Sequence, residues 1–213
     1  MRVGSRSIGT PYLDFAEVTF DGMPHKPQIV QCMDAGIPLT EGEHYTVAYL
    51  RNNEITDDFT SAGRITVQLT GINGYTGVYT ASMDIWQRQM VDVVAEDFQN
   101  TLYYTGYPQK PEVVLRLPNV YLLREGRDYT LTYMRSSAET TDFTSVGSIT
   151  IDVDAVDGGN FTGGQRLFYS IRENNIRDTI SITVPDSPVY NGQPHEPVIE
   201  VTHLDKTLTE GVD

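Results

Sequence analysis

The sequence contains a single cysteine, Cys32, among 213 residues, so no disulfide can form within the chain. This excludes the small secreted folds that depend on several disulfides. It is compatible with a reducing compartment, and equally with an exported protein that relies on its core. No apolar run approaches the roughly 20 residues that a membrane-spanning helix needs, and the first residues lack the apolar core of a signal peptide. We therefore expect a soluble chain. The sequence is also compatible with a piece cut from a longer protein.

Basic residues are scarce as well: 15 Lys and Arg stand against 29 Asp and Glu, which gives a net charge of −14. Such an acidic chain repels phosphate backbones and anionic lipids, so we expect no nucleic acid partner and no membrane partner. The sequence also lacks a glycine-rich phosphate loop, a nucleophile elbow and a paired-carboxylate signature. It therefore predicts a protein that is not an enzyme and needs no cofactor and no metal.

What the sequence does contain is a long internal repeat. The tetrapeptide Asp-Phe-Thr-Ser at 58–61 returns at 142–145, 84 residues later. A period of 84–86 residues is typical of an array of whole domains rather than of a solenoid of short units. We therefore predict one module at 1–87, a second at 88–173, and the opening strands of an incomplete third at 174–213. The residues that define the repeat are Gly22, Gly42, Tyr45, Gly63, Gly106, Gly126, Tyr129, Gly147, Gly192 and Gly211.

Short stretches with period-2 alternation predict β-strands. Tyr45, Val47 and Tyr49 share one face of such a stretch, and no segment shows a helical period over ten or more residues. The fold class predicted is all-β, as tandem antiparallel β-sandwich (Ig-like) modules. The joints near 86–89 and 172–175 are short and polar, which favours touching neighbours and a semi-rigid rod. Strands are expected at 26–30, 44–49, 65–69, 79–85, 91–94, 102–104, 112–117, 128–134, 148–153, 166–171, 180–183, 189–190 and 198–202.

The third module stops after its opening strands, and half a module cannot bury its apolar face alone. The first explanation is that the sequence is cut from a longer array. The second is that the second module, or a neighbouring chain that adds strands to the open edge, holds it.

Three short blocks of the second module carry a resemblance to a known family. They are formed by Tyr104, Gly106 and Pro111, by Leu123, Gly126, Asp128 and Tyr129, and by Asn160, Phe161, Thr162 and Gly163. In these blocks the sequence resembles the Ig-like repeats of bacterial cell-surface proteins, often grouped as MBG-type or YDG-type. The first module departs from the pattern at Phe20, His44 and Gly74. The resemblance implies an exported, surface-anchored array that serves as a stalk or adhesive region, without catalytic residues.

Two aromatic residues at corresponding turns, Tyr75 and Phe161, are the candidates for contact with a ligand. Aromatic faces suit sugar rings, so a carbohydrate platform is one interpretation. Because such rings recur at matching module positions, packing in the core and in turns is favoured.

The remaining candidate sites have plainer interpretations. Asp152, Asp154 and Asp157 suggest a calcium loop, but their spacing is not that of an EF-hand, and a hairpin turn is favoured. His25 and His195 stand alone in turns, whereas a metal site needs several converging ligands.

Two further side chains have reactive groups. Cys32 is expected to be a buried or idle thiol. A Lys–Asn crosslink from Lys26 or Lys110 is disfavoured because Glu196 takes the same place in the third copy.

The function expected is a non-enzymatic structural or adhesive region of an exported bacterial surface protein, located outside the cell, on its surface or secreted. The expected partners are neighbouring modules of the same chain, another chain that completes the third module, and a host or matrix glycan or protein. Two alternatives stay open: a carbohydrate- or protein-binding, lectin-like adhesin module, and an accessory β domain of a secreted glycan-degrading enzyme.

Overall fold

The computed structural model describes residues 6–118, 120–174, 180–184, 189–196, 198–203 and 206–211. The structure is nearly all β: of the described residues, 51% are in strands and 2% in helices, and they form several sheets. The predicted all-β, sandwich-like fold is confirmed. In the part of the chain that is described, no helix is long and apolar enough to cross a membrane.

The chain divides into two compact units. Unit 1 comprises residues 1–96, 114–131 and 153–165, and unit 2 comprises 97–113, 132–152 and 166–213. These limits differ from the repeat boundaries, because residues near 121 and 161 pack on the first 96 residues. The module boundaries at 87 and 173 stay a prediction. Below, residues 6–87 are called the first segment, 88–174 the second, and the described residues from 180 onward the third.

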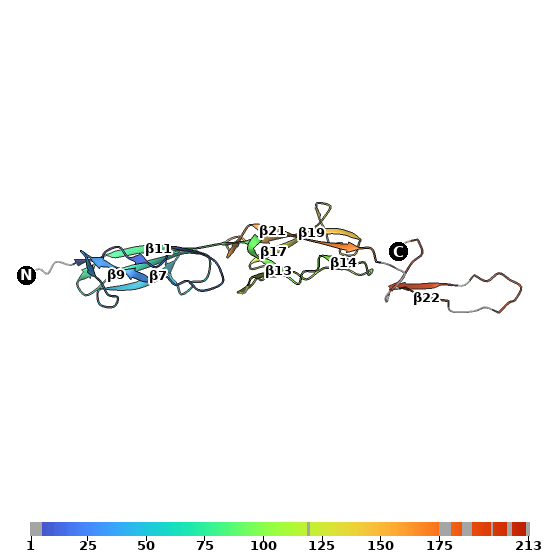
Figure 1. Ribbon diagram of the computed structural model, residues 1–213, viewed down its shortest axis with the longest axis horizontal. Coiled ribbons are helices and arrows are strands. Elements are labelled where there is room, and N and C mark those ends of the chain that lie inside the picture. Colours follow the sequence, from blue (N-terminus) through green and yellow to red (C-terminus); the bar gives the residue numbers. More distant parts are fainter. Residues whose placement is uncertain are drawn as a thin grey trace, which may run out of the picture. The chain divides into compact units, whose positions relative to one another are not determined.

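The first segment contains a five-stranded sheet with the order β3 (Glu17–Thr19), β11 (Val78–Trp86), β9 (Gly63–Gly71), β7 (Tyr45–Arg51) and β8 (Glu54–Ile55). Figure 1 shows β7, β9 and β11 in this part of the chain. The side chains of Ile65, Val67 and Leu69 alternate along β9 and are fully buried. Alternation therefore places one face of the sheet on the core, as expected for β-branched and apolar residues at every second position.

One edge of this sheet differs from the antiparallel expectation. β3 pairs in parallel with β11, with Val18 opposite Ile85 and Thr19 opposite Trp86. A hairpin cannot join parallel strands, but nearly sixty residues separate these two, which is ample for a crossover. The sheet is therefore mixed.

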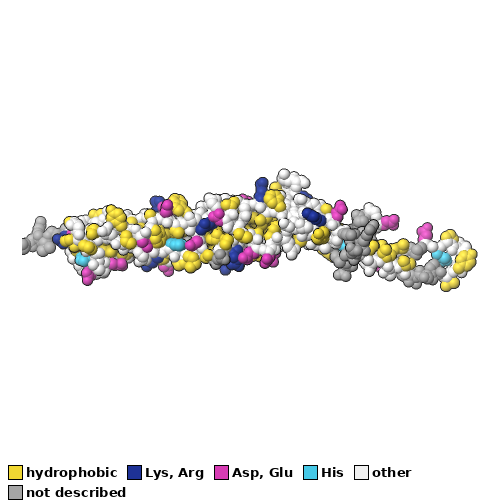
Figure 2. Space-filling view, viewed as in Figure 1, with side chains coloured by type: hydrophobic (Ala, Val, Ile, Leu, Met, Phe, Trp, Pro, Cys, Tyr) yellow, Lys and Arg dark blue, Asp and Glu magenta, His cyan; other side chains and the backbone are white. Residues whose placement is uncertain are grey.

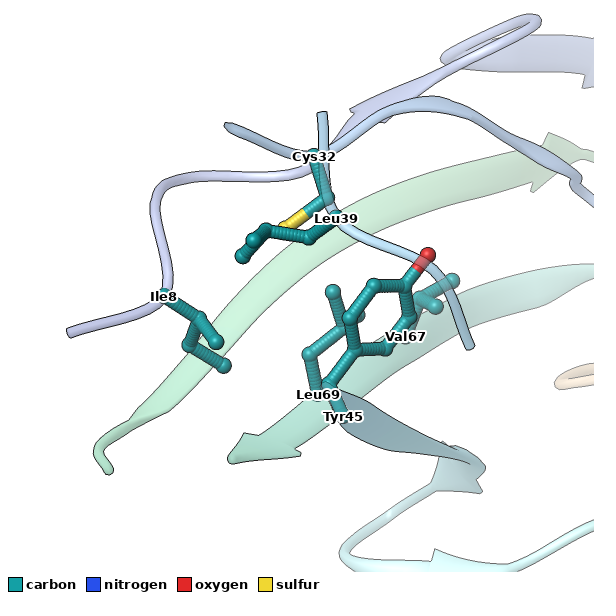
Figure 3. Close-up of a cluster of buried hydrophobic side chains, with 6 residues drawn as sticks. All are labelled: Ile8, Cys32, Leu39, Tyr45, Val67 and Leu69. Atoms are coloured by element: carbon teal, nitrogen blue, oxygen red, sulfur yellow. The ribbon is translucent and has the colours of Figure 1, made fainter. Parts of the chain in front are cut away.

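Short strands close the other side of the core. β1 (Arg6–Ser7) pairs with β10 (Tyr75–Thr76), β2 (Tyr12–Leu13) with β4 (Ile29–Gln31), and β5 (Met33–Asp34) with β6 (Ile37–Pro38). Figure 3 shows the buried cluster between these segments and the sheet. Cys32 lies in it at 4% exposure, with its thiol 3.6 Å from the carbonyl oxygen of Gly9. The cluster consists of Ile8, Cys32, Leu39, Tyr45, Val67 and Leu69.

The second segment contains a sheet of the same order: β14 (Thr101–Tyr103), β21 (Gly164–Arg172), β19 (Gly147–Ala155), β17 (Tyr129–Arg135) and β18 (Ala138–Glu139). Its long strands have the lengths of their counterparts: seven residues in β7 and β17, and nine in β9, β11, β19 and β21. β14 again pairs in parallel with the last strand, β21.

The entry to the second segment differs from the expected strand at 91–94. β12 (Arg88–Gln89) leads into a 3-10 helix, η1 (Met90–Asp92), and β13 (Val94–Glu96) follows. Met90 is fully buried, and the backbone N–H of Val93 donates to its carbonyl oxygen, which closes the helical turn. β13 then forms a three-stranded sheet with β15 (Val114–Leu117) and β16 (Tyr121–Leu122), while β12 pairs in parallel with β20 (Phe161–Thr162).

The third segment forms an antiparallel sheet of β22 (Ile180–Thr183), β23 (Glu200–His203) and β24 (Lys206–Thr207). The strand predicted at 180–183 is present. The one predicted at 189–190 is irregular, and both of its apolar side chains are largely exposed: Val189 at 86% and Tyr190 at 89%.

Candidate functional site

An aromatic cluster within unit 1 joins the first segment to the second. Phe20, directly after β3, is fully buried and packs edge-on against Tyr121 and Phe161, with ring centroids 5.3 and 5.4 Å away. Gly22 follows in the turn with a φ of +83°, and a Cβ there would lie 3.1 Å from the Tyr121 ring. Glycine is therefore required twice over, for its positive φ and for the close approach of this turn to the tyrosine.

Hydrogen bonds also stabilise the same junction. The Arg88 guanidinium Nε donates to the carbonyl oxygen of Phe20 at 2.9 Å. The side-chain oxygen of Asn160 accepts a hydrogen bond from the backbone N–H of Ala62 at 2.8 Å. The joint at 86–89 is therefore held by side chains as well as by its β12 pairing.

The Tyr121 ring is fixed by a charged pair beneath it. Arg127 donates to the Tyr121 hydroxyl at 2.6 Å and to Asp128 at 2.7 Å, and the hydroxyl itself donates to Asp128 at 3.3 Å. Asp128 is 3% exposed and also accepts from the backbone N–H of Arg124. Burial, and then the charge of Asp128, raise the pKa of the Tyr121 phenol, so the ring stays neutral in the junction.

A related arrangement recurs within unit 2. Tyr104 and Gly106 stand 84 residues after Phe20 and Gly22. Asn174 Nδ2 donates to the carbonyl oxygen of Tyr104 at 3.3 Å, as Arg88 does to that of Phe20. The Lys206 ammonium lies 5.8 Å from the centre of the Tyr104 ring. A cation therefore faces the Tyr104 turn, where the Tyr121 ring faces the Phe20 turn.

In each of the first two segments, a lysine ammonium lies close to two aromatic rings. Lys26 Nζ lies 4.6 Å from the centroid of Tyr49 and 5.4 Å from that of Phe59, and these two rings pack edge-on. The ammonium is thus directed at aromatic faces, which stabilises it there. The counterparts 84 residues later are Lys110, Tyr133 and Phe143, with distances of 4.5 and 5.4 Å.

Sequence reasoning missed the arginine that organises the Asp-Phe-Thr-Ser loop. Arg51 donates to the carbonyl oxygens of Ala62 and Ser61 at 2.9 Å and of Asp58 at 3.2 Å. Arg135 does the same for Val146, Ser145 and Asp142. The signal was present, because each arginine precedes its Asp-Phe-Thr-Ser loop by seven residues in both copies.

Within this loop the aspartate accepts hydrogen bonds from the loop's own backbone. Asp142 accepts from the backbone N–H groups of Thr144 and Ser145 at 3.0 and 2.9 Å. Hydrogen bonds from Ser145, side chain and backbone, then from Thr144, lower the pKa of Asp142 to about 2, and Arg135 adds to the effect. For Asp58, burial alone would raise the pKa, but hydrogen bonds from Ser61 and Thr60 and the charge of Arg51 outweigh it, and the pKa is lowered.

The two candidate ligand contacts lie in different surroundings. Tyr75 is partly exposed and packs edge-on against His44, with centroids 4.9 Å apart. Phe161 is 1% exposed, so its ring offers no face to a ligand in this structure and lies packed, which is the interpretation that the sequence favours over a ligand contact. The physical reason is the turn at Phe20, which covers it.

The repeat-defining residues adopt recurring conformations. Tyr45 and Tyr129 are 5% and 4% exposed and lie in the core. The glycines all have a positive φ, namely Gly22, Gly42, Gly63, Gly106, Gly126, Gly147, Gly192 and Gly211.

The acids and histidines that suggested metal sites make local contacts. Asp152 accepts from Arg166 at 2.6 Å across neighbouring strands. His25 lies 2.9 Å from Asp21, and His195 lies 2.8 Å from the corresponding Asn191. Among the described residues there is no group of three or more His, Cys, Asp or Glu side chains that could hold a metal ion.

No family model matches this chain, and no curated protein matches its sequence.

Proposed function

We propose that the chain is a load-bearing array of tandem Ig-like β modules, a non-enzymatic region of an exported bacterial surface protein that holds other domains away from the cell. The observation that carries this proposal is the parallel pairing of the first and last strands of the large sheet in both segments. Its consequence is mechanical.

In the first segment, force along the chain acts on β3 and β11 in opposite directions. Because the strands are parallel, their hydrogen bonds are loaded in shear and must break together, whereas an antiparallel terminal pair would unzip bond by bond. Two of these bonds run from Phe20 N–H to the carbonyl oxygen of Trp86 at 2.8 Å and from Asp84 N–H to that of Ala16 at 2.9 Å.

The second segment has the same arrangement. Leu102 stands opposite Ile171 in the parallel pair of β14 and β21. The backbone N–H of Tyr104 donates to the carbonyl oxygen of Arg172 at 2.8 Å, and that of Ser170 donates to Asn100 at 3.0 Å. Two such pairs in series would each resist extension.

Two other features support the proposal. Arg88, two positions after β11, donates to the carbonyl oxygen of Phe20, which follows β3, and Asn174, two positions after β21, donates to that of Tyr104, which follows β14. On the face shown in Figure 2, Asp and Glu side chains are scattered among neutral and hydrophobic ones, which suits a solvated region. The resemblance to bacterial surface repeats supplies the location.

Force spectroscopy on the full chain, held by its two termini, tests the mechanical role. We expect two main unfolding events, each releasing about 84 residues, or roughly 280–300 Å of contour length. Ser170→Pro removes the N–H that bonds Asn100 and should weaken one event only, while Ser170→Ala should weaken neither. A single event, or two events unaffected by Ser170→Pro, would contradict the proposal.

The location is tested separately on cells of the source organism. An antibody against the chain should label intact cells, and protease added outside should remove the label. Labelling that requires permeabilised cells would count against a surface role.

A further inference from the structure

The face that receives the Phe20 turn has a counterpart in the first segment. Tyr121 and Phe161 form that face in the second segment. The corresponding residues are Ile37, 84 positions before Tyr121, and Tyr75, 86 positions before Phe161. Ile37 is 48% exposed, and Tyr75 is partly exposed, whereas Phe161, the counterpart of Tyr75, is 1% exposed beneath the Phe20 turn. Ile37, His44 and Tyr75 are called the Ile37 face below.

The backbone beneath the Ile37 face is built as in the second segment. Arg6 pairs with Tyr75 in a parallel bridge, as Arg88 pairs with Phe161. His44 Nδ1 accepts from the backbone N–H of Thr40 at 2.8 Å, as the carboxylate of Asp128 does from Arg124. The receiving surface is therefore preformed.

The third segment presents a turn of the kind that such a face receives. Gly192 has a φ of +81°, against +83° for Gly22. Asn191 Oδ1 accepts from Gln193 N–H at 3.0 Å and lies 2.8 Å from His195, as Asp21 does with Met23 and His25. Tyr190, which stands where Phe20 and Tyr104 stand, is 89% exposed.

We propose that the Ile37 face binds the Tyr190–Gly192 turn of a second copy of this chain. The inference rests on the proposed array, because it uses the correspondence between its modules. Docking would place Tyr190 against Ile37 and Tyr75, so that apolar area exposed in the single chain is removed from water. The contact is heterologous, since one copy contributes the turn and the other the face, and it can continue from chain to chain. A contact this small makes a weak, concentration-dependent association.

Sedimentation equilibrium of the full chain over micromolar to millimolar concentrations tests this. The weight-average mass should rise above the 23.8 kDa of a single chain as concentration increases. Ile37→Asp places a charge on the face and Tyr190→Ser removes the ring of the turn, so each variant alone should stay at the single-chain mass. A mixture of the two should form pairs and no longer species, because the first variant keeps its turn and the second keeps its face.

Ile55→Asp is the matched control, because Ile55 is 84% exposed on β8 and lies outside the face. It should associate as the unaltered chain does, and circular dichroism should show that all variants are folded. The proposal is overturned if the unaltered chain stays at the single-chain mass, if Ile37→Asp associates like Ile55→Asp, or if the mixture does not pair. These outcomes leave the force measurements on a single chain untouched, so failure of the docking and failure of the load-bearing role are distinguishable.

Discussion

The ring of Phe20 meets the ring of Tyr121 edge-on, with 5.3 Å between centroids and 86° between planes. The two residues are about a hundred positions apart in the sequence. Their contact joins the end of β3 to β16, so that a buried residue of the first segment packs against a residue of the second.

This contact should appear as an energetic coupling. In a double-mutant cycle of Phe20→Leu and Tyr121→Leu, we expect a coupling free energy of about 0.5–1.5 kcal/mol, because edge-on aromatic pairs contribute beyond their buried area. Urea unfolding of the four proteins measures it. Phe168, at 62% exposure, provides the control, since Phe168→Leu should show no coupling to Phe20→Leu. Strictly additive effects at Phe20 and Tyr121 would contradict the contact.

The Arg51 site predicts an unequal cost for two glycine substitutions. Gly63 has a φ of +128°, and a Cβ there would lie 2.6 Å from Arg51 Nη1, whereas a Cβ at Gly42 meets no atom within 4 Å. Gly63→Ala should cost about 1–3 kcal/mol in strain and also displace the guanidinium. Gly42→Ala should cost about 1–2 kcal/mol.

A second measurement isolates the contribution of the arginine. Arg51→Ala should destabilise the fold by about 1.5–3 kcal/mol, since the charged donors to three carbonyl oxygens are lost. The double variant Arg51→Ala/Gly63→Ala should lose less unfolding free energy than the two single variants lose together, because removal of the guanidinium also removes its clash with the new Cβ. Equal costs at Gly63 and Gly42 in chemical denaturation would refute this assignment.

The loop aspartate predicts a specific acid dependence. The pKa of Asp142 is lowered from 3.8 to about 2 in the folded chain. A lowered folded-state pKa means that the ionised loop stabilises the fold above pH 3.8, and that this contribution is lost as the pH falls towards 2. The difference in unfolding free energy between the unaltered chain and Asp142→Asn should therefore be largest above pH 5 and shrink below pH 4. A difference that does not vary between pH 2 and pH 6 would rule this out.

The lysine between two rings predicts a modest effect of charge. Lys110→Met keeps the apolar stem and removes the ammonium, so it should cost about 0.5–1 kcal/mol, and Lys26→Met should cost about the same. Lys110→Arg retains the cation and serves as control. Lys110→Glu should cost more than Lys110→Met, since it directs an anion at the rings of Tyr133 and Phe143. Thermal unfolding in the same buffer measures the stability of each variant. A Lys110→Met variant that is more stable than the unaltered chain would contradict the contact.

The long strands could be predicted because their determinants are local. Alternation at Ile65, Val67 and Leu69 indicates both the strand and its buried face before any partner is known. The parallel pairing of β3 with β11 could not be predicted in this way, because the pattern of one strand carries no information on the direction of its neighbour. The same holds for η1, where burial of Met90 overrides a strand-like stretch.

The junction was predicted only in outline. Short joints indicate touching neighbours, and the recurrence of aromatic rings favours packing for Phe161, but nothing in its own stretch shows that Phe20 is the residue that covers it. Arg51 was overlooked for the opposite reason, since a polar residue at the end of a strand is usually solvated. Comparing the two copies position by position, with Arg135 in the same place, would have revealed it.

The account depends on one β module occurring twice, each copy able to fold by itself, and residues 88–174 expressed alone test this most directly. We expect a β-type circular dichroism spectrum and a single cooperative urea transition. Substitution of buried Ile151 by Ala should lower the free energy of unfolding obtained from that transition by about 2–5 kcal/mol. An isolated segment that shows no cooperative transition, while the full chain unfolds cooperatively, would contradict the account.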